Sequence, residues 1–340
     1  MNYEDVLDDF GLLIEDDLKS QFELAVKESR EYHPFMADVY STIQEFVLRE
    51  GRRLASCSTL MVYKGYTGQI DDRIVKACSG VELYRHSILV HDDIVDVEDL
   101  RRGGETLHKI FGRNYGEKFG VGTALFAGNM LYAIALRAVL QSGFESEKLM
   151  DAIRLFSSEY GAVNESQILD QLFEHKEPIL NEWNVMASKR ASSLFKASML
   201  TGAILASAPE NDKGTLACAA EHIGYAFDIQ DDIIDTFASK EQYGREPCGD
   251  ISKRKKPLHI VLALEKDNRL ALLIGKPHTD VEVVQGLIRD CGALDEAKSI
   301  SRDHAKEAQR LISLTGMSEE AKDFFASFIK YVDESLDWYK

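Results

Sequence analysis

The sequence has few cysteines, few prolines and no apolar run at its start. Its five cysteines in 340 residues are an odd, scattered set without a CxxC pair, so they give no support to a disulfide framework or a zinc site. The first twenty residues are acidic and lack the basic and then apolar order of a signal peptide. We therefore expect a cytoplasmic protein without a transmembrane segment, and we expect the least charged stretch, residues 120–136, to form a buried helix.

Positive charge is also in short supply. The chain has 40 Lys and Arg against 57 Asp and Glu, which gives a formal net charge of −17. So acidic a chain is not expected to bind nucleic acid or an anionic membrane surface. Any site for an anionic ligand must therefore depend on a local group of basic residues.

The chain lacks the sustained alternation of polar and apolar residues that marks β-strands. Apolar residues recur instead at three- and four-residue spacing in nearly every segment, which predicts an all-α protein. The prolines fall in the gaps between these segments, where they do not interrupt a helix: Pro34, Pro178, Pro209, Pro247, Pro257 and Pro277. Because no linker-like or low-complexity tract divides the chain, we expect residues 1–340 to form a single large helical domain.

Two segments share the pattern DDxxD, and each follows an apolar helical stretch. They are HDDIVD, with Asp92, Asp93 and Asp96, and QDDIID, with Asp231, Asp232 and Asp235. On a helix, positions i and i+4 lie one turn apart on one face, so each segment presents two carboxylates side by side. Such a pair is costly near a core unless a cation neutralises it. Magnesium suits the pattern because it takes one or two carboxylates and completes its shell with water and phosphate oxygens.

The ordered set of motifs resembles the trans-type polyprenyl diphosphate synthases. The matching segments are EGRRL (50–54), DDIVDVEDLRRGGETLH, SQILD (166–170), SKRASSLF (188–195) and FDIQDDIIDTFASKEQYGREPCGDISKRKKP. The resemblance implies an all-α isoprenoid synthase fold around a central cavity, as a homodimer. It also implies a prenyltransferase that uses magnesium, three ions per active site, to elongate an allylic diphosphate with isopentenyl diphosphate.

The resemblance also implies roles for individual residues. The metal ligands would be Asp92, Asp96, Asp231 and Asp235. The allylic diphosphate and its metals would be held by Arg101, Lys189, Arg245 and Lys255, and the isopentenyl diphosphate by Arg52, Arg53 and Arg102. Gln167 and Asp170 would lie near the reacting centre, and Phe227 would line the isopentenyl side. The residues implied in catalysis are Asp92, Asp96, Asp231, Arg101, Lys189 and Gln167.

Simpler interpretations remain open for some of these residues. Arg101 and Arg102 could end a helix ahead of Gly103 and Gly104. His91 is expected to pack or to hydrogen-bond outside the metal shell. In the basic run KRKK (253–256), only Lys255 is expected to have a site role.

Several positions depart from the family pattern. Arg52 and Ala55 stand where the family usually has a lysine and an arginine, and Arg85 stands where it often has His or Gln. We hypothesise that the Arg85 guanidinium, which can bind a diphosphate in two-pronged fashion, replaces the missing contact. Three further positions depart from the pattern: Arg190, after Lys189, for threonine, Asp228 for glutamine and Arg245 for lysine.

The residues before the first segment bear on product length. Ser87 is small where a bulky residue stops chain growth early in this family, and Tyr84 lies one turn deeper. We therefore expect a product of twenty carbons, geranylgeranyl diphosphate. The alternatives are a synthase for twenty-five carbons or more, a non-catalytic partner subunit of another synthase, and a class I terpene cyclase.

Overall fold

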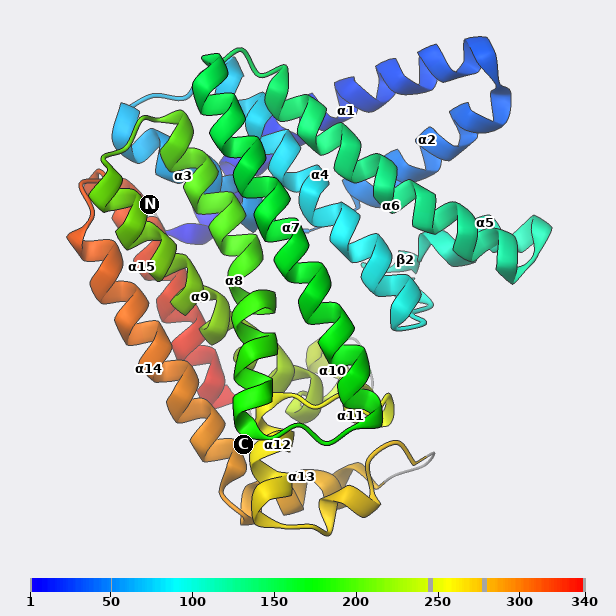
Figure 1. Ribbon diagram of the computed structural model, residues 1–340, viewed down its shortest axis with the longest axis vertical. Coiled ribbons are helices and arrows are strands. Elements are labelled where there is room, and N and C mark those ends of the chain that lie inside the picture. Colours follow the sequence, from blue (N-terminus) through cyan, green and yellow to red (C-terminus); the bar gives the residue numbers. More distant parts are fainter. Residues whose placement is uncertain (1, 50, 244–246, 277–279, 339–340) are drawn as a thin grey trace. The chain divides into compact units, whose positions relative to one another are not determined.

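The computed structural model describes residues 2–49, 51–243, 247–276 and 280–338. Its helices are α1 (Tyr3–Tyr32), α2 (Pro34–Leu48), α3 (Leu54–Thr67), α4 (Asp72–Val95), α5 (Leu107–Tyr115), α6 (Glu117–Leu140), α7 (Ser146–His175), α8 (Leu180–Leu205), α9 (Glu210–Phe237), α10 (Lys240–Tyr243), α11 (Gly249–Ser252), α12 (Leu258–Lys266), α13 (Val281–Asp290), α14 (Ala293–Leu314) and α15 (Glu319–Ser335). Short 3₁₀ turns, η1 (Leu270–Leu272) and η2 (Leu336–Trp338), and one small hairpin, β1 (Leu100–Arg101) and β2 (Gly104–Glu105), complete the described elements (Figure 1). The expected all-α fold is confirmed.

The chain divides into two compact units. Unit 1 contains the residues up to Phe156 together with Ser198–Ala208 and Met317–Ala321. Unit 2 contains Ser157–Ala197, Pro209–Gly316 and the residues from Lys322 onwards. The first aspartate segment belongs to unit 1 and the second to unit 2. The expectation of a single domain around a central cavity stays a prediction.

In unit 1, α4 packs against α1, α3 and α6. The hairpin of α1 and α2 (Figure 1) turns at His33, whose extended backbone ends α1 and whose ring accepts a hydrogen bond from the Phe35 N–H. Pro34 follows as the first residue of α2, where its fixed φ and missing N–H do not disturb the helix. α4 begins at the N-cap Asp71, which accepts from the N–H groups of Arg73 and Ile74. This start sets the register that carries Asp92 to the last turn.

In unit 2, α9 packs along α14, and α12 and α13 pack against α14 as well. The core of the unit is made of buried apolar residues from these helices and from α7 and α8, among them Phe173, Trp183, Ile229, Ile233, Leu262 and Ile288. The C-terminal part of α9 is therefore fixed by apolar contacts. Its Asp-rich turn is positioned by the core beneath it.

The prolines lie where the sequence predicted. Pro34 opens α2, Pro209 and Pro257 are the N-caps of α9 and α12, and Pro178 and Pro247 lie between helices; Pro277 is outside the described residues.

One described helix, α6, is long and apolar enough to cross a membrane, by length and composition alone; 33% of its most apolar stretch is buried. The expected buried helix over residues 120–136 is therefore buried only in part. One face of α6 packs in unit 1, while Leu125 and Phe126 on the other face are 43% and 66% exposed.

Candidate active site

The first aspartate segment closes α4. Asp92 and Asp93 lie in the last turn, and Asp96 is the C-cap residue, whose N–H donates to the Asp92 carbonyl at 2.9 Å. Asp92 and Asp96 therefore lie one turn apart, as the spacing predicted. Because α4 ends at Val95, the alternative that Arg101 and Arg102 cap this helix ahead of the glycines is wrong.

Arg101 and Arg102 lie instead on the small hairpin. β1 and β2 pair antiparallel, and the turn between them has Arg102 at φ 50° and Gly103 at φ 74°. Two successive left-handed residues form the tight turn that suits a two-residue hairpin. A side chain other than glycine is strained there, and such strain is kept where the surrounding structure fixes it. A Cβ on Gly51 would lie 2.6 Å from the Arg102 guanidinium, so the Gly51 backbone packs directly against it.

Arg101 binds the first aspartate segment itself. Its Nε donates to Asp93 Oδ1 at 2.5 Å, and its Nη2 donates to Asp92 Oδ2 at 3.2 Å. Burial raises the pKa of Asp93 to about 7, although Arg101 opposes the rise. Arg101 is thus already held beside the predicted metal ligand Asp92, where a diphosphate bound to the metal would meet it.

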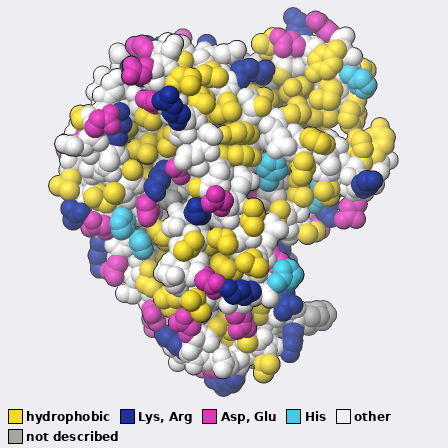
Figure 2. Space-filling view, viewed as in Figure 1, with side chains coloured by type: hydrophobic (Ala, Val, Ile, Leu, Met, Phe, Trp, Pro, Cys, Tyr) yellow, Lys and Arg dark blue, Asp and Glu magenta, His cyan; other side chains and the backbone are white. Residues whose placement is uncertain are grey.

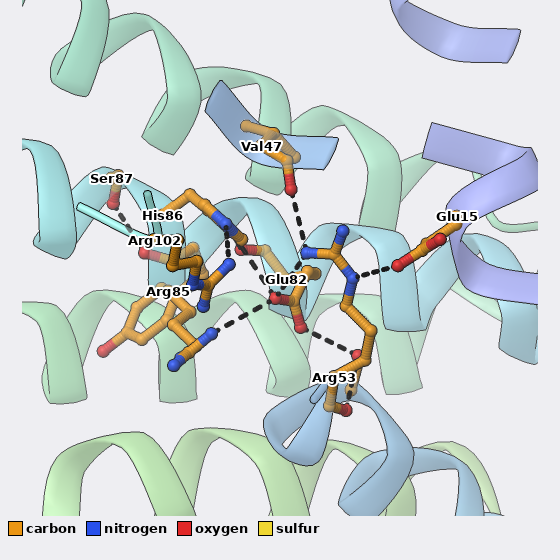
Figure 3. A network of polar contacts seen from close by, with 10 residues as sticks. Glu15, Val47, Arg53, Glu82, Arg85, His86, Ser87 and Arg102 are labelled. Carbon is orange, nitrogen blue, oxygen red and sulfur yellow. Dashed lines mark hydrogen bonds and ion pairs between the residues drawn. The ribbon is translucent and has the colours of Figure 1, made fainter. Parts of the chain in front are cut away.

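A second group of basic residues surrounds one buried carboxylate (Figure 3). We call it the Glu82 cluster: Glu82 with Arg53, Arg85, His86 and Arg102. Glu82 Oε1 lies 3.3 Å from Arg53 Nη1 and 3.5 Å from Arg85 Nη1. Ser56 donates to the other carboxylate oxygen, Oε2, at 2.8 Å. Burial disfavours the charge, but His86, which is protonated only at the acidic pH where Glu82 titrates, and the arginines Arg85 and Arg53 more than offset it and lower the pKa of Glu82 to about 2.

His86 connects Arg102 to this cluster. Arg102 Nη1 lies 3.3 Å from His86 Nε2, and since a guanidinium only donates, Nε2 must accept. The proton of the neutral ring is then on Nδ1, which donates to the Glu82 carbonyl at 2.8 Å. Burial lowers the pKa of His86 to about 3, in agreement with a neutral ring.

Counted over the described residues, the Glu82 cluster carries more positive charge than its acids neutralise. Arg53 is also paired with Glu15, at 2.9 Å, and is almost fully buried. Burial and then repulsion from Arg85 lower the pKa of Arg102 to about 10, although Glu82 opposes the fall. A group of this kind favours a multiply charged anion.

The predicted isopentenyl residue Arg52 lies elsewhere in unit 1. Its Nη1 donates to Glu4 at 2.8 Å and to the Tyr3 hydroxyl at 3.1 Å, and its side chain is largely exposed. The structure therefore brings Arg53, Arg85 and Arg102 together but pairs Arg52 with α1. No residue pattern local to EGRRL indicated this difference between two adjacent arginines.

Tyr84 and Ser87 are both fully buried on α4. The Tyr84 ring centroid lies 4.9 Å from that of Phe156 and 6.2 Å from that of Tyr132. Ser87 donates to the Tyr84 carbonyl at 2.7 Å, which turns its hydroxyl toward its own helix. Tyr84 thus belongs to an aromatic layer two turns below Asp92.

His91 packs against α6, as expected. Its Nε2 lies 3.2 Å from the Leu125 carbonyl, and a Cβ on Gly128 would collide with the ring. The close approach of the two helices here requires a glycine.

The second aspartate segment lies in the C-terminal part of α9. Asp231 is exposed, Asp232 is partly buried, and Asp235 is buried at 9% exposure. Asp235 accepts the backbone N–H of Asp250 at 3.0 Å, which ties the start of α11 to α9. Burial and the neighbouring Asp235 raise the pKa of Asp250 to about 6. The two predicted ligands of this segment are therefore unequal, since Asp235 also anchors a loop.

Arg190 lies at the centre of this acidic region. Its Nη2 donates to Asp228 at 2.6 Å and to Asp232 at 3.4 Å, and its Nη1 lies 3.7 Å from Asp170. Burial raises the pKa of Asp232 well above its usual value in spite of Arg190. Two of the positions that depart from the family pattern, Arg190 and Asp228, are thus partners in one ion pair.

The predicted site residues Lys255 and Lys189 are also paired with acids. Lys255 Nζ lies 3.6 Å from Asp170, and Lys189 donates to Glu165 at 2.5 Å. Lys256 is buried and donates to the Phe173 carbonyl at 3.2 Å, so it has a structural role at the end of α7. Of Lys255 and Lys256 in the basic run, only Lys255 pairs with a predicted site residue, Asp170.

The other predicted residues of unit 2 are placed as follows. Phe227 packs between Phe195 and Phe328, with ring centroids 5.9 and 6.0 Å away, and Gln167 is partly buried on α7. Arg245 lies outside the described residues.

Comparison with known proteins identifies the family. The family model described as Polyprenyl synthetase matches residues 37–291. A short chain isoprenyl diphosphate synthase from Methanocaldococcus jannaschii is 30% identical over 255 residues, which are 74% of this chain and 75% of the relative. The chain belongs to the polyprenyl synthetase family. It is therefore a prenyltransferase.

Two further family members show the range of this likeness. A geranylfarnesyl diphosphate synthase from Aeropyrum pernix is 26% identical over 84% of this chain and 91% of its own length. A crystal structure of a geranylgeranyl pyrophosphate synthase from Corynebacterium glutamicum, complexed with isoprenyl diphosphate and magnesium, superposes with a TM-score of 0.89. That comparison covers 98% of this chain and 99% of the other at 20% identity, so it shows the fold alone.

The carboxylates of the two aspartate segments fit magnesium only as part of its coordination shell. In the part of the chain that the structure describes, no three His, Cys, Asp or Glu side chains form a group that could hold a metal ion. Asp92 and Asp96 supply oxygen ligands of the type magnesium prefers, one turn apart and accessible.

Sequence reasoning missed the residues that hold the arginines in place. Glu82 and His86 were not singled out, although an acid in the apolar run GVELYRHSILV is a usable signal, since a buried acid needs a basic partner. The hairpin was missed because two-residue strands leave no periodic pattern. The packing of Gly51 on Arg102 depends on a contact between distant segments, which the local sequence does not encode.

Proposed function

We propose that this polyprenyl synthetase condenses an allylic diphosphate with isopentenyl diphosphate, with magnesium bound by Asp92, Asp96, Asp231 and Asp235, and forms geranylgeranyl diphosphate. The single observation that carries the proposal is the Glu82 cluster, because its excess of buried and partly buried arginine charge suits a diphosphate. The magnesium in the Corynebacterium glutamicum structure supports the choice of metal.

Each group of residues has a part in this reaction. Arg85 and Arg102 hold the isopentenyl diphosphate in two-pronged contacts, while Glu82 and His86 fix the direction of both guanidinium groups. Arg101 contributes positive charge beside Asp92, where the allylic diphosphate leaves. Bound magnesium would neutralise the charge that grows on the leaving diphosphate as the allylic C–O bond breaks.

The proposed product length depends on the aromatic layer. The Tyr84 and Phe156 rings lie in tilted contact, with centroids 4.9 Å apart, midway along the buried stretch of α4, and the small Ser87 follows Tyr84 one turn nearer to Asp92. The relatives include a short chain synthase and a geranylfarnesyl synthase. The products named for these relatives lie on either side of the proposed twenty-carbon length, and a product of twenty-five carbons is the alternative.

We also propose a homodimer. The exposed face of α6 carries Leu125 and Phe126, and hydrophobic side chains are visible at the surface over this part of the chain (Figure 2). Burying such a face is favourable at about 25 cal/mol per Å² of apolar surface. Phe126→Glu should convert the dimer into a monomer in light scattering coupled to gel filtration, and Glu147→Gln, an exposed change on α7, should not. A dimer that survives Phe126→Glu would contradict this interface.

A cytoplasmic location stays a prediction.

A product assay tests the proposed reaction. Purified protein is given magnesium, labelled isopentenyl diphosphate and, in parallel, five-, ten- or fifteen-carbon allylic diphosphates, and the products are separated after dephosphorylation. We expect magnesium-dependent incorporation that ends near twenty carbons. Absence of label while the allylic diphosphate still binds would contradict the proposed isopentenyl site and would favour the partner-subunit or cyclase alternative.

A substitution tests the part assigned to Arg85. Arg85→Gln should raise the Michaelis constant for isopentenyl diphosphate by about tenfold, since one hydrogen bond between charged groups is lost. The constant for the allylic substrate should not change. Arg73→Gln is the matched control, because Arg73 lies on the same helix and pairs with Asp71 in an exposed position. Equal effects of the two variants would exclude Arg85 from the isopentenyl site.

A further inference from the structure

Three carboxylates of unit 2 converge on one guanidinium. Asp170 of α7, Asp228 of α9 and Asp232 of α9 lie 3.7, 2.6 and 3.4 Å from the terminal nitrogens of Arg190 on α8. We call the space that these carboxylates enclose the acidic niche. Arg190 fills it.

The niche is poorly hydrated. The side chains of Asp170, Asp232 and Asp228 are only 7%, 12% and 19% exposed, and that of Arg190 is 20% exposed. Carboxylates at this depth repel each other strongly and require a cation among them. Lys255 contributes to this at one edge only, 3.6 Å from Asp170.

Arg190 is suited to this place by its shape. Its Nε and Nη2 both donate to Asp228 Oδ2, at 3.1 and 2.6 Å, while Nη2 also reaches Asp232. A planar guanidinium can contact several carboxylates at once, whereas a threonine at this position would contribute no charge. The resemblance implies threonine and glutamine at the positions of Arg190 and Asp228, and the structure places the two residues in contact as one positive and one negative charge.

The same geometry would suit a divalent cation if the guanidinium were absent. Asp228 and Asp232 contact the same nitrogen of Arg190, so their oxygens point at one place, and Asp170 borders it. Hard divalent cations prefer such carboxylate oxygens. No three acidic, His or Cys side chains in the described ranges form a group that could hold a metal ion by themselves, so a cation between Asp228 and Asp232 would need water to complete its shell.

We propose that Arg190 is a resident cation of the acidic niche, and that it excludes a divalent cation from Asp170, Asp228 and Asp232. Metal binding by the second aspartate segment is thereby confined to Asp231 and Asp235. The inference rests on the proposed function in so far as that segment binds magnesium, but it concerns the residues around the ligands rather than the ligands themselves.

Manganese binding without substrate tests the proposal. Free and bound Mn²⁺ are counted by electron paramagnetic resonance in the parent, in Arg190→Thr and in the double variant Arg190→Thr/Asp228→Gln. Arg190→Thr should bind one additional Mn²⁺ per chain, with an affinity about tenfold or more above that of the parent's weakest site. Its unfolding temperature should rise more on addition of Mn²⁺ than that of the parent. The double variant removes a positive and a negative charge together, so it should bind the same number of ions as the parent.

Two further variants make the result specific. Arg302→Thr removes another arginine of unit 2 that bridges two aspartates, Asp333 at 3.4 Å and Asp337 at 2.5 Å, but those carboxylates are exposed, so no additional ion is expected. Arg190→Lys keeps the charge and should also gain no ion. It serves as the folded reference if Arg190→Thr is unstable without Mn²⁺.

The proposal is overturned if Arg190→Thr binds the same number of ions with the same affinities as the parent, or if Arg190→Lys gains the additional ion as well. It is also overturned if the double variant keeps that ion. Because no substrate is used, these outcomes do not depend on whether the protein elongates prenyl chains. A failed product assay would leave the manganese result standing, and the reverse is equally true.

Discussion

Replacing Glu82 with Gln removes the carboxylate at the centre of the Glu82 cluster without changing the size of the side chain. Glu82 is fully buried, and its surroundings lower its pKa from 4.5 to about 2. A shift of that size corresponds to about 3 kcal/mol of preference for the charged side chain in the folded protein. The variant also leaves Arg53, which is 1% exposed, without its buried acidic partner. We therefore expect the free energy of unfolding to fall by about 3 kcal/mol near neutral pH.

The effect should depend on pH in a defined direction. A carboxyl group whose pKa is lowered on folding stabilises the protein fully above its unfolded pKa, and this stabilisation disappears as pH falls through the folded pKa. For Glu82 the window runs from about 4.5 down to about 2. The parent and Glu82→Gln should thus differ most near neutral pH and converge at the acidic end of that window, in urea unfolding followed by circular dichroism.

Glu15→Gln is the matched control. Glu15 also pairs with Arg53, at 2.9 Å, but it is 33% exposed. Partly exposed pairs contribute at most about 1 kcal/mol, so this variant should lose no more than that. If Glu82→Gln loses less than Glu15→Gln, or if its deficit does not shrink at low pH, the reasoning from the buried carboxylate is refuted.

Three further outcomes test other parts of the molecule. Gly51→Ala would place a Cβ 2.6 Å from the Arg102 guanidinium and displace it, so the Michaelis constant for isopentenyl diphosphate should rise about tenfold. Gly122→Ala is the control, because its added Cβ would meet nothing within 4 Å. Equal Michaelis constants for the two variants would contradict the displacement of Arg102. Tyr84→Ala opens the layer that it forms with Phe156 and should lengthen the main product by at least one five-carbon unit, whereas unchanged length would remove Tyr84 as the floor. Removal of divalent cations with EDTA should stop incorporation of label, and incorporation that persists in EDTA would argue against metal assistance.

The parts of the site that follow from local spacing could be predicted from the sequence. Asp92 and Asp96 are one turn apart because the end of α4 preserves helical geometry up to its C-cap. The all-α fold follows in the same way from the three- and four-residue spacing of apolar side chains. These features depend on neighbours within one helical turn, so a single sequence is sufficient to show them.

The partners of the charged residues could not be predicted, because they depend on tertiary contacts. Arg52 and Arg53 are adjacent in the chain, yet Arg52 bonds to Glu4 at the surface while Arg53 is buried with Glu82. Lys189 matched a diphosphate contact by its motif, but its side chain pairs with Glu165 on the neighbouring helix. In each case the motif gave the position of the residue, and the packing of helices gave its partner.

The departures from the family pattern are better explained by local charge than by residue identity. Ala55 removes a positive charge next to Ser56, which itself bonds to Glu82, and Arg85 returns a positive charge to the same carboxylate from the next helix. Arg190 adds a positive charge, and its partner Asp228 adds a negative one in contact with it. Each change looks like a lost contact when its position is considered alone, whereas together with its partner it leaves the local charge unchanged. Because diphosphate and metal binding respond chiefly to the charge that surrounds them, substitutions of this kind can coexist with prenyl transfer.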